Sequence, residues 1–158
     1  MFPEGISLSG KFTFENKFLQ SLQINTGHFI LATTGTSFDS DGYFQGLQFV
    51  TAHWKDRLKL FPTFYYFNKI PNIPDGNETY TMNYAIVHVG TNIELNKKPK
   101  ITATFDYYQN IKDYKGNDSI PQNFRNQKQG FVSSASIGKL EKKGDWKLQF
   151  THVYLERF

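Results

Sequence analysis

The feature that most constrains the fold of this chain is an alternation of apolar and polar residues with a period of two. It is clearest in the segment that begins at Gly5. One row there contains Ile6, Leu8, Gly10, Phe12 and Phe14, and the intervening row contains Ser7, Ser9, Lys11, Thr13 and Glu15. Because successive side chains of a β-strand point to opposite faces of its sheet, this pattern predicts a strand with one apolar and one polar face.

Similar segments recur along the whole chain. They cover approximately residues 5–15, 20–32, 43–54, 57–68, 81–95, 99–110, 129–140 and 145–157. Their lengths suit strands that cross a bilayer at a tilt. In the third segment the pattern assigns no face. Together the segments predict an all-β fold of about eight antiparallel strands in a single domain over residues 1–158.

The connections between these segments alternate in length. The short ones are Asn16 to Leu19, Lys55 to Asp56, Asn96 to Lys98 and Glu141 to Gly144, and the long ones are Thr33 to Gly42, Lys69 to Tyr80 and Ile111 to Lys128. Short turns at one end and long loops at the other are typical of outer-membrane β-barrels, with the short turns in the periplasm. The chain is therefore predicted to form an antiparallel up-and-down transmembrane β-barrel.

The direction of the strands adds an expectation about completeness. If the short turns are periplasmic, the first strand runs toward the periplasm and the eighth runs away from it. A bacterial barrel normally starts and finishes in the periplasm, so we expect this chain to be an internal fragment of a larger barrel.

The composition agrees with two-faced strands in lipid. Aromatic residues make up 17% of the chain and charged residues 20%, while the mean hydropathy is negative. A barrel with an apolar outer face and a wet inner face accounts for this combination. Aromatic residues also fall near both strand ends, as membrane girdles do. The predicted girdle consists of Phe18, Trp54 and Trp146 beside the short turns and Tyr66, Tyr107 and Tyr154 nearer the long loops.

The charged residues of the polar rows are the candidate functional residues. We predict that Lys11, Lys59, Glu94, Asp106 and Lys147 line a pore. Charges that face a lumen bias which ions enter, and the excess of lysine favours anions. The alternative is that these side chains form salt bridges that brace a closed interior, and the sequence leaves both interpretations open.

Other chemistry finds little support in the sequence. There is no cysteine, and the four histidines, His28, His53, His88 and His152, fall on four different predicted strands, so we expect no metal site. We find no nucleophile with an adjacent base and no phosphate-binding glycine motif, and we expect neither enzymatic activity nor a cofactor. The net charge of +4 is scattered rather than clustered, which argues against a nucleic-acid partner.

Two stretches resemble the porin family of outer-membrane β-barrels in Gram-negative bacteria. One is Gly46-Leu47-Gln48-Phe49 followed by Leu58-Lys59-Leu60, and the other is Gly138-Lys139-Leu140 with Lys143-Gly144-Asp145-Trp146 and Tyr154-Leu155-Glu156. The resemblance begins at about Tyr43 and covers about three quarters of the chain. It implies passive diffusion of small hydrophilic solutes or ions across the outer membrane, with membrane lipid as the surroundings. It leaves open the solute and whether several copies associate as a homo-oligomer.

A soluble, lipocalin-like β-barrel that binds an apolar ligand is the alternative, because it uses the same period of two with the faces reversed. In that case Phe12, Phe64 and Phe105 point inward, and Lys11, Lys59 and Asp106 are solvated outside. A barrel without a pore that serves as an anchor or adhesin is a third possibility, which conductance would distinguish from a porin.

Overall fold

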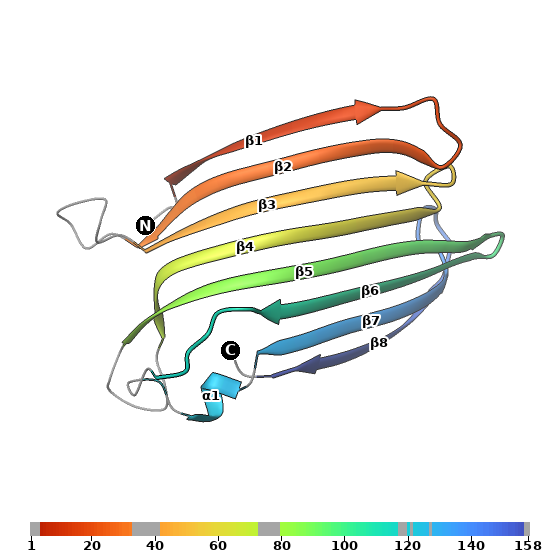
Figure 1. Ribbon diagram of the computed structural model, residues 1–158. Coiled ribbons are helices and arrows are strands. Elements are labelled where there is room, and N and C mark those ends of the chain that lie inside the picture. The colour runs from red at the N-terminus through yellow and green to blue at the C-terminus, as the bar shows by residue number, and fades with distance from the viewer. Residues whose placement is uncertain are drawn as a thin grey trace.

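The strands of the computed structural model follow the chain in order. The structure describes residues 4–32, 42–72, 80–116, 120, 122–126 and 128–156. Its elements are β1 (Glu4–Thr13), β2 (Leu19–Ala32), β3 (Gly42–His53), β4 (Leu58–Asn72), β5 (Tyr80–Lys97), β6 (Lys100–Asn110), α1 (Gln122–Asn126), β7 (Gln129–Gly138) and β8 (Lys147–Leu155). Each strand pairs antiparallel with the next in one sheet (Figure 1). The predicted all-β, up-and-down arrangement is confirmed.

The sheet is open rather than closed. Its order runs from β1 to β8, so these two strands are its edges, and within the described residues they do not pair with each other. The strands lie side by side, and the sheet that they form is curved (Figure 1). The structure thus confirms the strands and their order, and the described part of the chain is not closed into a barrel. That the chain is a fragment of a larger transmembrane barrel stays a prediction. Most of the predicted loops Thr33 to Gly42 and Lys69 to Tyr80 lies outside the described residues, whereas most of Ile111 to Lys128 is described.

The β7–β8 turn shows how local sequence ends a strand. Gly138 and Gly144 adopt positive φ angles of 92° and 91°, a conformation that costs glycine little because it has no Cβ. The carboxylate of Asp145 accepts hydrogen bonds from the backbone N–H groups of Glu141 and Lys142, both at 2.9 Å. These bonds hold the pKa of Asp145 below its ordinary value. The Gly-Asp sequence therefore closes this turn by supplying both the backbone conformation and the acceptor.

The register assigns each strand residue to one of two faces. The apolar face includes Ile6, Leu8, Phe12, Ile24, Leu47, Phe49, Leu60, Phe64, Val87, Val89, Phe105, Tyr107, Phe131, Leu148 and Phe150. The polar face includes Ser9, Lys11, Gln23, Asn25, Gln48, Lys59, Thr63, His88, Glu94, Thr104, Asp106, Ser134, Lys147 and Gln149. The pairing also assigns the two faces of β3, because it places Leu47 on the apolar face and Gln48 on the polar face.

The two faces differ in exposure. Phe64 and Phe105 on the apolar face are 41% and 44% exposed, whereas Thr63 and His88 on the polar face are 5% and 7% exposed. Side chains crowd together on the inner side of a curved sheet and spread apart on its outer side. The polar face is therefore the concave one, and the apolar residues lie on the convex surface.

A small cluster at the long-loop end covers part of the polar face. Met82 on β5 packs with Tyr114 and Ile120, which follow β6. Asn110, which is 1% exposed, donates a hydrogen bond from Nδ2 to the Tyr114 hydroxyl at 2.9 Å and accepts one from the backbone N–H of Ala85 at 3.3 Å. This buried amide therefore fixes the start of the β6–α1 connection. No helix in the described residues is both long and apolar enough to cross a membrane.

Candidate functional site

A row of hydrogen-bonded polar side chains crosses the concave face. We call it the polar ladder, and its members are Ser9, Asn25, Gln48, Thr63, His88 and Asp106. The first five lie directly opposite one another on β1 to β5. Antiparallel neighbours in such a row have Cβ atoms about 5 Å apart, within reach of amide and hydroxyl groups. The sequence places a polar residue at this height on each of these five strands, so the register builds the ladder.

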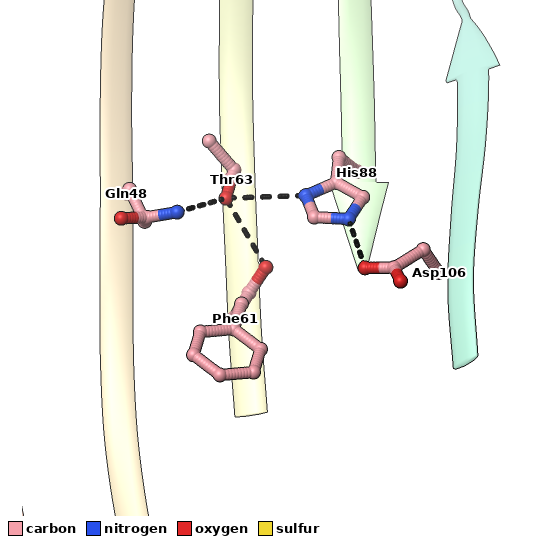
Figure 2. A network of polar contacts seen from close by, with 5 residues as sticks. All are labelled: Gln48, Phe61, Thr63, His88 and Asp106. Carbon is pink, nitrogen blue, oxygen red and sulfur yellow. Dashed lines mark hydrogen bonds and ion pairs between the residues drawn. The ribbon is translucent and has the colours of Figure 1, made fainter. Parts of the chain in front are cut away.

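The ladder is continuous from strand to strand. Ser9 Oγ donates to Asn25 Oδ1 at 2.7 Å, and Asn25 Nδ2 donates to Gln48 Oε1 at 3.0 Å. Gln48 Nε2 donates to Thr63 Oγ1 at 3.4 Å, and Thr63 lies 3.4 Å from His88 Nδ1 (Figure 2). The last step joins His88 Nε2 to Asp106 Oδ1 at 3.0 Å. Six strands are thereby linked through their side chains as well as their backbones.

The contact between His88 and Asp106 fixes the position of one ring hydrogen of the imidazole. A carboxylate can only accept, so His88 Nε2 carries the hydrogen that reaches Asp106. His88 Nδ1 can either accept from the Thr63 hydroxyl or, when protonated, donate to it. In the second case the Thr63 hydroxyl donates to the Phe61 carbonyl oxygen, which lies 3.1 Å away (Figure 2). Rotation of the Thr63 hydroxyl therefore satisfies either role of His88 Nδ1, as acceptor or as donor.

Packing also holds the His88 ring in place. It stacks on Tyr108 with ring centroids 4.5 Å apart and planes 15° apart, and Tyr65 lies on its other side at 6.4 Å. Gly90 lies opposite Asp106, and a Cβ there would come 2.6 Å from Asp106 Oδ1. The glycine therefore leaves the space through which Asp106 reaches His88.

The structure places all the predicted pore-lining residues on the polar face. These are Lys11, Lys59, Glu94, Asp106 and Lys147. Among the described residues Asp106 is the member that contacts a titratable group of opposite type, His88 at 3.0 Å, and the other four form no ion pair. The interpretation that these side chains brace the interior through salt bridges therefore stays a prediction. The role of these five residues in lining a pore stays a prediction.

Sequence reasoning missed most of the ladder. It treated His88 only as a candidate metal ligand, and it gave no role to Asn25, Gln48 or Thr63. The alternation places these residues on polar rows, but only the register shows that they share one height in the sheet. Within the described residues, no three histidine, aspartate or glutamate side chains gather closely enough to hold a metal ion.

The predicted girdle residues lie at strand ends. Phe18 precedes β2, Trp54 follows β3 and Trp146 precedes β8. Phe18 and Trp54 meet edge to face with ring centroids 6.0 Å apart. At the other end of the sheet, Tyr66, Tyr107 and Tyr154 project from the apolar face. The positions fit two girdles, and contact of these rings with a membrane interface stays a prediction.

Comparison with known proteins does not identify a family for this chain. No family model matches this chain, and no curated protein or solved structure matches it either. The resemblance to a porin family therefore stays a prediction, and the functional argument depends on the two faces of the sheet.

Proposed function

We propose that this chain forms part of the wall of a porin in the outer membrane of a Gram-negative bacterium. Small hydrophilic solutes or ions would diffuse passively along its polar face, without catalysis and without a cofactor. The observation that carries this proposal is the exposure of the apolar face together with the burial of Thr63 and His88 at the middle of the polar one.

The apolar face is poorly suited to water. Phe12, Phe64 and Phe105 come from three strands, and all three are exposed among further exposed apolar residues. Exposed apolar patches of this extent mark contact with a membrane or a partner, because each exposed large side chain forgoes about 1.5–3 kcal/mol of burial free energy. Acyl chains supply that burial on the outside of a membrane barrel.

The polar face suits a wet interior. Its amide, hydroxyl and imidazole groups are hydrogen-bonded across the strands, and it carries the five predicted pore-lining charges. In the lipocalin-like alternative the faces are reversed, with Phe64 and Phe105 inside and Lys59 outside. The exposures favour the porin over this alternative.

The open edges set a requirement for the proposal. Unpaired backbone N–H and C=O groups cost several kcal/mol each in lipid, so spanning strands must be closed into a ring. Further strands, from the same protein or from other copies, must therefore pair with β1 and β8. Eight strands alone would in any case enclose an interior that side chains fill.

The test begins with folding. The purified chain is refolded with and without detergent micelles and examined by circular dichroism and size-exclusion chromatography. We expect a β-type spectrum and a monodisperse species only with micelles, followed by conductance steps in planar bilayers. Clean folding in plain buffer would favour the soluble ligand-binding barrel, and folding in micelles without conductance would indicate an anchor or adhesin.

A further inference from the structure

A hollow lies on the polar face beside the polar ladder. It has a volume of about 290 Å³ and spans β1 to β4. Gly27 and Gly46, which are opposite each other on β2 and β3, form its floor. Because glycine has no side chain, neighbouring side chains can lie close to the backbone here. We call this feature the glycine hollow.

Aromatic rings form one side of the glycine hollow. Phe29 and Phe44 are nearly parallel, with ring centroids 5.9 Å apart and planes 19° apart, and Tyr65 continues the row 5.7 Å from Phe44. A Cβ on Gly27 would lie 2.6 Å from the Phe29 ring, and one on Gly46 would lie 3.2 Å from the Phe44 ring. The rings therefore rest over the glycines. Their electron-rich faces suit weakly positive C–H groups.

Amides of the polar ladder form the other side. Asn25 Oδ1 accepts from Ser9 at 2.7 Å and from Gln23 at 2.9 Å, while its Nδ2 donates once, to Gln48. An amide nitrogen carries two hydrogens and an amide oxygen has two lone pairs. Asn25 and Gln48 thus each retain one N–H without a partner in the described residues, and Gln48 Oε1 retains one lone pair. Both amides are held in place and still offer donors and an acceptor.

The glycine hollow is electrically neutral. Of the residues that line it, all within the described part of the chain, none carries a charged side chain. An ion would lose hydration there without gaining a counter-charge. A ligand that fits must instead be neutral, with an apolar face for the rings and hydroxyl groups that both donate and accept.

We propose that the glycine hollow binds a neutral sugar ring. Its C–H face would pack against Phe29 and Phe44, and adjacent hydroxyls would bond to the amides of Asn25 and Gln48. This inference rests on the proposed pore function and deepens it, because it names neutral saccharides as the class of solute that the wall recognises.

The test measures binding to the micelle-refolded protein by isothermal titration calorimetry. The probes are glucose, galactose and xylose, with sodium gluconate as an anionic relative of glucose. We expect saturable binding of at least one sugar and weaker binding of gluconate. Gln48→Ala should weaken sugar binding about 3- to 10-fold through the lost hydrogen bonds. Gln149→Ala, on the same face of β8 and outside the hollow, should leave it unchanged.

A second variant tests the site independently, in case Gln48→Ala fails to fold. Phe44→Leu keeps apolar volume but removes a ring, and it should also weaken binding, whereas Phe105→Leu on the apolar face should not. Absence of binding by all three sugars, or gluconate binding as tight as glucose, would overturn the proposal. Conductance without sugar binding would reject the sugar site and keep the pore. Sugar binding without conductance would reject the pore and keep the site.

Discussion

His88 and Asp106 are joined at 3.0 Å although they are not opposite each other in the sheet. The register pairs His88 with Tyr108 and Asp106 with Gly90, so the aspartate reaches diagonally across the space above the glycine. The stacking of His88 on Tyr108 leaves its Nε2 directed at that space. This hydrogen bond therefore depends on the small size of residue 90 as well as on its two partners.

Gly90→Ala should break this hydrogen bond. The new Cβ would lie 2.6 Å from Asp106 Oδ1 and 3.0 Å from the His88 ring, so the carboxylate must move away. A buried imidazole that loses its partner destabilises a fold by about 1–3 kcal/mol. Urea unfolding of the micelle-refolded protein measures the loss. Gly10→Ala is the control, since a Cβ there meets nothing within 4 Å, and equal effects of the two substitutions would contradict this role for Gly90.

The sequence predicts the strands well because period two is a local property. The sequence could not assign the two faces of β3. Phe44 and Gln48 lie on one face and Gln45 and Phe49 on the other, so each face carries one aromatic ring and one amide. Closure into a ring and the polar ladder both depend on which residues of different strands lie opposite each other. That register is fixed by pairing over the whole sheet, and no single strand contains it.

Asp145→Asn should remove a pH-dependent part of the stability. The hydrogen bonds from the Glu141 and Lys142 N–H groups lower the pKa of Asp145 from its ordinary 3.8. A carboxyl group whose pKa is lower in the folded state stabilises the fold above its unfolded pKa, and this contribution is lost as the pH falls through the folded pKa. The urea midpoint of the parent should therefore drop more steeply below pH 3.8 than that of the variant.

Asp56→Asn is the matched control for this turn. Asp56 lies in the β3–β4 turn with a positive φ of 63°, which asparagine also tolerates. In the described residues its carboxylate accepts no hydrogen bond, so the variant should keep the parent's pH profile. If Asp145→Asn also keeps that profile, the turn contact does not contribute to the acid sensitivity.

Asn110→Ala should loosen the β6–α1 connection. The substitution removes the acceptor of the Ala85 and Lys112 N–H groups and the donor to the Tyr114 hydroxyl. Each buried group left without a partner costs about 1–3 kcal/mol. Hydrogen exchange of residues 111–116 should accelerate, while exchange in β2 stays slow. Asn92→Ala, at an exposed position of the polar face, should change neither, and unaltered exchange in Asn110→Ala would show that the cluster holds without this amide.

Phe150 and Gln149 provide the sharpest test of the membrane assignment. They are neighbours on β8, both exposed, and they point to opposite faces. In water a lysine is tolerated equally at two exposed positions of one strand. In a bilayer, Phe150→Lys should cost about 2–4 kcal/mol near the midplane, whereas Gln149→Lys would face the wet side. We therefore expect Phe150→Lys to lower the yield of protein folded into lipid vesicles and Gln149→Lys to leave it unchanged. Equal yields for the two variants would mean that the apolar face does not contact lipid.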